Sequence, residues 1–225
     1  MENRQEATEI ILRNRCVLLP LFSRVFAEEP NAELVELLAS DDACAAIDLV
    51  ATEQNGLGHL VSLLRSLPQG DALPAFVDDA RAEYTALFYG PQKPLAPFWE
   101  SVYLDPRELL FLESTADVKR RYESEGFRVN AESRVAEDSL AFELDFLAQL
   151  AQRTGNAFLD GDDAEYARLL DVQLTFERDH LLNWLPAFAE RAQNAPTAHL
   201  YPALCAAVSS LIATDATLLE ELAAA

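Results

Sequence analysis

The sequence pattern that most narrows the choice of fold lies in residues 137–153. Apolar residues recur there at every third or fourth position, which is the period of an α-helix. One stripe consists of Leu140, Leu144, Leu147 and Ala151, and it is widened by Phe142, Phe146 and Leu150. A helix that is apolar around so much of its circumference must be covered on several sides. The pattern therefore predicts a helical bundle with this segment at its centre.

The rest of the chain shows the same helical period and almost none of the alternation that is typical of strands. The predicted helices cover residues 11–27, 32–39, 42–66, 74–88, 115–124, 137–153, 162–193 and a last segment after Thr197. Asp162 begins a capping box, Pro186 is expected to bend the helix that follows, and Thr197 is expected to cap the last helix. A chain of this length can bury a substantial core, so we expect one all-α domain over residues 1–225.

Residues 91–106 interrupt this helical pattern. They contain four prolines, which are Pro91, Pro94, Pro97 and Pro106. Proline lacks a backbone N–H and disfavours the helical conformation of the residue before it. The segment is therefore predicted to be a proline-rich irregular loop between helices.

The charge of the chain limits its partners. It has 38 acidic and 17 basic residues, which give a net charge of −21. Such a surface repels nucleic acid and anionic lipid and attracts cationic partners, so nucleic-acid binding is excluded and a basic peptide would suit it. The alternative is a generally acidic, salt-adapted proteome in which the charge only keeps the surface solvated. The sequence leaves both interpretations open.

The cysteines and the hydropathy indicate the cellular compartment in which the protein is expected to work. Cys16, Cys44 and Cys205 are widely separated and form no C-x-x-C pair, so they predict reduced thiols rather than a disulfide framework or a zinc site. No stretch reaches the roughly 18 uninterrupted apolar residues of a membrane span. We therefore expect a cytoplasmic protein without stable membrane insertion.

No complete catalytic motif is present. The chain has no phosphate-binding P-loop, no G-x-S-x-G elbow and no G-x-G-x-x-G turn. Its three histidines, His59, His180 and His199, are far apart in the sequence. Glu177-x-x-His180 is the ligand motif of di-iron helical bundles, but such bundles need it twice and a second copy is absent. The sequence therefore predicts no catalytic residue, no cofactor and no metal, with a helical metalloenzyme as the weakest hypothesis.

Three segments resemble the TorD/DmsD family of redox-enzyme maturation chaperones. Residues 83–103, EYTALFYGPQKPLAPFWESVY, are similar to the family's block of Leu-Phe, Gly-Pro, Ala-Pro and Glu-Ser-Val-Tyr. Residues 135–150, VAEDSLAFELDFLAQL, resemble its acidic hinge and the helix after it. Residues 176–191, FERDHLLNWLPAFAER, resemble its late helix with His, Trp and Pro. The resemblance spans roughly residues 80–220, and the first third of the chain matches only as generic helices.

The resemblance implies a function in binding rather than catalysis. It implies a chaperone that holds the twin-arginine leader and the apo-form of a molybdenum-containing oxidoreductase, of the dimethyl sulfoxide or trimethylamine N-oxide reductase kind, until cofactor insertion and export. A NarJ-like assembly factor for a non-exported nitrate-reductase-type subunit is the alternative. The chain is expected to be either a monomer or a domain-swapped dimer.

The resemblance and the residue types also assign a peptide-binding site. A leader with a cationic start and an apolar stretch needs carboxylates beside an aromatic groove. The residues assigned are Glu83, Tyr84, Phe88, Trp99, Glu100, Tyr103, Glu137, Asp138, Glu143, His180 and Trp184. At the hinge the family commonly has Glu-Pro-x-Asp-His, whereas residues 135–139 read Val-Ala-Glu-Asp-Ser. Glu137 and Asp138 are alternatively interpreted as the acidic first turn of the central helix.

Overall fold

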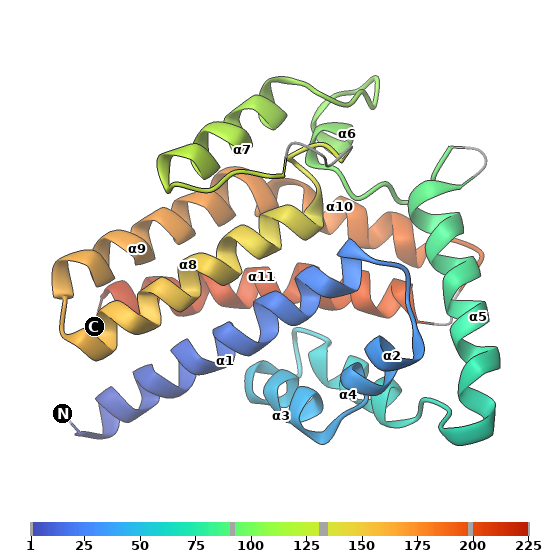
Figure 1. Ribbon diagram of the computed structural model, residues 1–225, viewed down its shortest axis with the longest axis horizontal. Helices are drawn as coiled ribbons and strands as arrows, with labels where there is room; N and C mark the ends of the chain where they lie inside the picture. Colours follow the sequence, from blue (N-terminus) through green and yellow to red (C-terminus); the bar gives the residue numbers. More distant parts are fainter. Residues whose placement is uncertain (1, 91–92, 131–134, 198–199, 225) are drawn as a thin grey trace.

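The predicted central helix is α8, Leu140–Asp160, and it lies at the middle of the fold (Figure 1). The computed structural model describes residues 2–90, 93–130, 135–197 and 200–224. Within them, α8 packs along α1 (Glu2–Ala27) on one side and α9 (Asp163–Phe176) on the other. The helix begins only at Leu140, so Asp138 precedes it and does not belong to its first turn.

The other helices surround this centre. α10 (Leu182–Gln193) and α11 (Tyr201–Ala223) pack against each other and complete the bundle. The short helices α2 (Ala32–Leu38), α3 (Asp41–Val50) and α4 (Leu57–Arg65) lie beside α1 and α11, and α5 (Leu73–Tyr84) crosses one end (Figure 1). α6 (Glu100–Leu104) lies inside the proline-rich segment, so residues 91–106 are not irregular throughout as predicted, and α7 (Glu113–Ser124) follows the segment. The described residues contain no strand, which confirms the all-α prediction.

The predicted helix over residues 42–66 is wrong as a single element. α3 ends at Val50 and α4 begins at Leu57. Between them, the Asn55 side-chain oxygen accepts hydrogen bonds from the N–H groups of Thr52 and Leu57, and Gly56 takes a left-handed φ of 68°. The Asn-Gly pair therefore builds a turn that competes with the continuous helix.

The predicted helix over residues 162–193 is confirmed as a continuous helical segment, Asp163–Gln193, which contains one irregular turn. Asp162 caps α9 as expected, because its side chain accepts a hydrogen bond from the N–H of Glu165. The irregular turn lies at η3, a π-helical turn over Glu177–Leu181, which ends before Pro186. Widened turns of this kind recur at functional sites. Here Glu177 and His180 are both buried.

The last helix is capped by a residue from a distant part of the chain. α11 begins at Tyr201, and the buried carboxylate of Glu83 accepts hydrogen bonds from the N–H groups of Leu200 and Tyr201, both at 2.7 Å. Thr197, the predicted cap, instead donates its hydroxyl to Glu83 at 2.6 Å. A carboxylate is favoured there because helix N-termini carry unsatisfied N–H groups and a positive dipole end. Pro91 and His199 lie outside the described residues.

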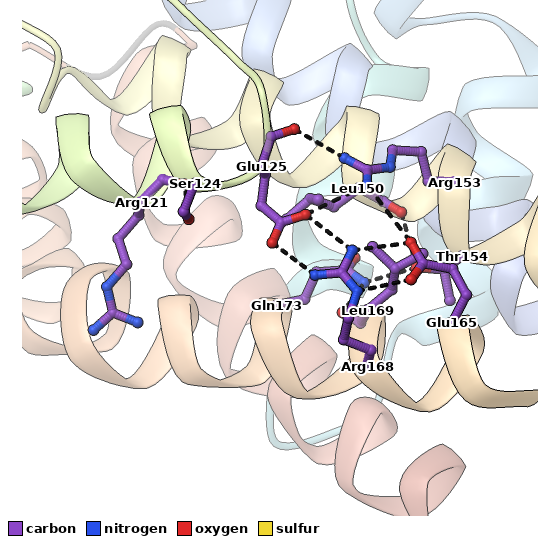
Figure 2. Close-up of polar contacts among 10 residues, drawn as sticks. All are labelled: Arg121, Ser124, Glu125, Leu150, Arg153, Thr154, Glu165, Arg168, Leu169 and Gln173. Atoms are coloured by element: carbon purple, nitrogen blue, oxygen red, sulfur yellow. Dashed lines mark hydrogen bonds and ion pairs between the residues drawn. The ribbon is translucent and has the colours of Figure 1, made fainter.

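The end of α7 is held against the bundle by an ion-pair network (Figure 2). The carboxylate of Glu125 receives two hydrogen bonds from Arg168 of α9, at 2.7 and 3.0 Å, and Arg168 also pairs with Glu165. Arg153 of α8 donates to the backbone carbonyl of Glu125. Because Glu125 lies just beyond α7, these contacts fix that helix to both α8 and α9.

A second polar cluster lies inside the bundle. Arg15 of α1 pairs with Asp215 of α11 through bonds of 2.7 and 3.0 Å, and it donates to Gln173 of α9 at 2.8 Å. Gln173 in turn donates to Thr154 of α8 (Figure 2). Burial raises the pKa of Glu177, which is also raised by the nearby charge of Asp215. The cluster joins four helices across the core.

α11 is the one helix among the described residues that is long and apolar enough to cross a membrane by length and composition. In this fold 56% of its apolar window is buried inside the protein. Its apolar character is therefore explained by its place in the core, where Leu204, Val208 and Ile212 are fully covered.

Candidate peptide-binding site

The proline-rich segment and the acidic hinge are joined by backbone hydrogen bonds. Trp99 and Ser139 form an isolated antiparallel bridge. The N–H of Glu100 donates to the carbonyl of Asp138 at 3.0 Å, and the N–H of Leu140 donates to the carbonyl of Phe98 at 2.9 Å. Two segments that lie about forty residues apart in the chain are therefore fixed in register, as strand pairing fixes register.

Glu100 is the residue at which all three family-like segments meet. Its carboxylate is fully buried and lies 3.0 and 3.1 Å from Nδ1 of His180, which comes from η3. Asp138 uses one carboxylate oxygen to accept a hydrogen bond from the N–H of Ser101 at 2.9 Å. The other ring nitrogen of His180 lies 3.2 Å from Asp117 of α7. The site therefore draws on α6, α7, the hinge and η3.

Glu143 adds a third buried carboxylate to this site. It lies on the first turn of α8, is completely covered, and neither of its oxygens has a hydrogen-bond partner among the described residues. Burial raises the pKa of Glu143 well above its ordinary value, and the neighbouring carboxylates of Glu100 and Asp138 raise it further. No lysine or arginine in the described part of the chain forms an ion pair with any of the three acids.

Two half-buried aromatic side chains, Trp99 and Tyr103, lie close to Glu100 in the sequence. Trp99 is half-buried, and its ring is tilted by 34° against the ring of Phe98, with ring centroids 4.6 Å apart. Tyr103 is also half-buried and stacks on the buried Trp184 at 5.4 Å. The guanidinium of Arg191 lies 5.3 Å from the centre of the Tyr103 ring. Burial raises the pKa of the Tyr103 hydroxyl, so this hydroxyl stays uncharged.

Four of the predicted site residues belong to other surroundings. Glu83 caps α11, while Tyr84 and Phe88 are buried in an aromatic cluster that includes Tyr201. Glu83 accepts hydrogen bonds from Thr197 and Tyr201, and the hydroxyl of Tyr84 donates to the carbonyl of Phe26. None of these partners belongs to the Glu100 cluster. Glu137 is only half-buried, pairs with Lys119 at 3.3 Å, and lines a surface hollow of about 480 Å³ beside α7.

Comparison with known proteins decides the family. The family model described as nitrate reductase delta subunit matches residues 52–190. This chain belongs to that family. A curated chaperone protein TorD of Vibrio cholerae is 29% identical over 217 residues, which are 95% of this chain and 96% of the relative. TorD of Aliivibrio salmonicida is 28% identical and covers 81% of this chain and 83% of its own length. TorD of Photobacterium profundum is 34% identical over 48% of this chain and 49% of its own.

The predicted resemblance to the TorD type of chaperone is thereby confirmed. TorD-type proteins form a non-catalytic maturation family, so this member is a chaperone and not an enzyme. At the family's hinge histidine position this chain has Ser139, which is buried and leaves its hydroxyl without a hydrogen-bond partner among the described residues. His180 supplies the imidazole of the site from another helix.

The two side chains of the Glu177-x-x-His180 motif belong to different polar networks in this TorD-type fold. The π-helical turn separates the two side chains, so that Glu177 lies by Asp215 and Arg15 while His180 binds Glu100. The described residues contain no group of three His, Cys, Asp or Glu side chains placed to hold a metal ion. The pair is explained by two separate buried networks.

Two residues of the site carry no distinctive signal in the sequence. Asp117 is predicted only as part of the helix over residues 115–124, and Arg191 only as the end of a family-like segment. Both contact residues that are distant in the sequence, since Asp117 lies near His180 and Arg191 binds Glu108 at 2.7 Å. Their charge is the one feature that could have pointed to them, and many exposed residues share it.

We expect Glu143→Gln to stabilise the protein in a pH-dependent way. Because the folded-state pKa of Glu143 is raised, its carboxyl stabilises the fold below its ordinary pKa of 4.5, and this stability is lost as the pH rises towards the folded-state value. Glutamine keeps the shape without the charge. Urea unfolding should therefore give the variant a higher free energy of unfolding than the parent protein at pH 8, and the difference should be smaller at pH 5.

The control is Asp145→Asn, which removes an exposed carboxylate from the same helix. In this variant the free energy of unfolding should change between pH 5 and pH 8 by the same amount as in the parent protein. An unchanged pH dependence in Glu143→Gln would show that Glu143 is not held with a raised pKa.

Proposed function

We propose that this protein is a chaperone that binds the twin-arginine leader and the apo-form of a molybdenum-containing oxidoreductase, of the dimethyl sulfoxide or trimethylamine N-oxide reductase kind, before cofactor insertion and export. The proposal rests on the similarity to curated TorD chaperones over 95% of the chain. It treats residues 1–225 as one functional domain that works in the cytoplasm.

The observation that carries the proposal is the burial of three acidic side chains in one place. Glu100, Asp138 and Glu143 lie together without an arginine or lysine partner among the described residues. Burying carboxylates without cations is costly, so a guanidinium that enters the site gains more there than at the surface. Two adjacent arginines in an extended leader match several carboxylates in one place. The net charge of −21 also attracts the cationic start of such a leader.

Residues 105–112 are the segment that we assign to opening the site. The three carboxylates are closed to solvent in this conformation, so a ligand must move a covering element. Glu108 and Phe111 in this segment adopt left-handed φ values of 53° and 61°, which are strained for residues with a Cβ. Arg191 and Lys93 both hold Glu108 by ion pairs. Breaking those partly exposed pairs costs little, so the segment can move without unfolding the bundle.

The same segment offers an apolar surface. Leu109, Leu110 and Phe111 are consecutive and exposed, and 68% of Phe111 is open to solvent. Exposed apolar patches of this kind mark interaction sites. We assign the apolar stretch of the leader to this surface, beside the half-buried Trp99 and Tyr103.

The proposal is tested by titrating the protein with the client's leader and with a copy in which both arginines are glutamine. A charge-assisted hydrogen bond contributes about 1.5–3 kcal/mol, so the neutral leader should bind at least about tenfold more weakly in calorimetry. The loss should shrink as salt is raised, because the approach of the charged leader is screened. A leader altered only at basic positions outside the arginine pair is the control. Equal affinity of the parent and glutamine leaders would refute the assignment.

A second candidate is an assembly factor for a non-exported subunit of the nitrate reductase type. The match to the family model described as nitrate reductase delta subunit favours it. Co-purification from the native host separates the two candidates. A bound molybdoenzyme precursor with a twin-arginine leader supports the first, and a bound subunit without a leader supports the second.

A further inference from the structure

A separate groove lies between α1, the end of α3 with the segment after it, and α11. Its volume is about 410 Å³, within the range of ligand pockets in proteins. None of its lining residues belongs to the three segments that meet at Glu100. It is therefore a distinct surface, and the leader site does not explain it.

The walls of the groove are apolar and partly open. Ile10 is 46% exposed and Leu49 is 56% exposed, and both line it with Leu18 and Leu211. Two lining residues are charged, Arg15 and Asp215, and they pair with each other. The groove therefore has no free carboxylate for a cationic ligand and no unpaired cation for an anionic one.

One hydrogen-bond donor at the groove lacks a partner. Nη1 of the buried Arg15 is unpaired among the described residues, although its Nε and Nη2 atoms bind Asp215 and Gln173. Two other polar side chains that line the groove have partners, since Asn14 donates to Ala46 and Thr214 accepts from Asn55. A buried donor of this kind is most stable when an acceptor reaches it. Because Asp215 already balances the charge of Arg15, a neutral carbonyl oxygen fits better than a carboxylate.

We propose that this groove binds a short, uncharged, apolar segment of the client's immature chain, with one backbone carbonyl accepting a hydrogen bond from Arg15. The inference rests on the proposed chaperone function and adds a second contact to it. A peptide segment supplies apolar side chains and neutral carbonyl groups together. A second copy of this chain fits less well, because each copy carries a net charge of −21 and the two would repel each other.

The test uses a short acetylated and amidated peptide of leucine, alanine and serine that carries a neutral fluorophore. Its binding to the full chain is followed by fluorescence anisotropy. Leu49→Glu and Ile10→Glu place charge on exposed groove positions without removing core side chains. Losing the burial of one leucine-sized side chain should weaken binding by about tenfold or more. Leu159→Glu is the matched control, because Leu159 is 67% exposed and lies outside the groove.

The same variants are also titrated with the twin-arginine leader. This separates a loss of binding at the groove from a loss of binding at the leader site. Weaker peptide binding with unchanged leader binding supports the groove. Full peptide affinity in both groove variants, or an equal loss in Leu159→Glu, overturns it. Self-association that Leu49→Glu abolishes, with no peptide binding by the parent protein, also overturns it in favour of a second copy. Melting curves confirm that each variant is folded.

Discussion

Replacing Arg15 by methionine should cause a large loss of stability. Methionine fills much of the space of the arginine side chain, but it leaves the carboxylate of Asp215 buried without its cation, beside Glu177. Removing one partner of a buried ion pair typically costs about 3–5 kcal/mol. Equilibrium unfolding in urea at pH 7 should show a decrease of that size in the free energy of unfolding.

The exposed residue Arg13 provides the matched control. It lies on the same helix and its side chain is 77% exposed, where it pairs with Glu9. Arg13→Met should change the free energy of unfolding by no more than about 0.5 kcal/mol. The double variant Arg15→Met, Asp215→Asn should recover part of the lost stability, because the uncompensated charge is gone. A loss in Arg15→Met no larger than that in Arg13→Met would contradict the proposed role of the ion pair.

Trp99→Ala should weaken leader binding by about 2–4 kcal/mol, the range of aromatic anchors at protein interfaces. Trp99 is half-buried and directly precedes Glu100, and its backbone, which pairs with Ser139, is kept in the variant. Calorimetry with the twin-arginine leader measures the loss. The helical circular dichroism should stay close to that of the parent protein, because the neighbouring Phe98, which is buried, is kept.

Phe158→Ala is the control for a lost aromatic ring. Phe158 is also half-buried, but it lies near the far end of α8 against Tyr166. It should lower the melting temperature without changing leader affinity. If Trp99→Ala instead lowered stability and bound the leader at full strength once folded, Trp99 would be a structural residue and not part of the leader site.

The sequence predicted those features that depend on neighbouring residues. The apolar stripe of residues 137–153 identified the central helix, and Asp162 was recognised as a cap because its partner is only three residues away. The three family-like segments were also identified from local motifs. The family comparison confirms the chaperone type to which they point.

Features that depend on contacts across the chain could not be predicted in this way. Glu83 was assigned to the peptide site, yet it caps a helix more than one hundred residues later. The burial of Glu100, Asp138 and Glu143 together depends on the register of a short bridge, which no periodicity encodes. Carboxylates usually lie at the surface, so their sequence positions gave no sign of this burial.

The ion pair between Arg15 and Asp215 has a consequence for synthesis on the ribosome. The two residues are 200 positions apart, and α1 packs mainly on α8 rather than on its neighbours in the chain. The first helix therefore leaves the exit tunnel long before its partners exist. Contacts of such long range slow folding and leave apolar surface exposed in the meantime. We expect the nascent chain to close its core only after α11 has been released, so that a protein which protects others is itself vulnerable until this helix has been made.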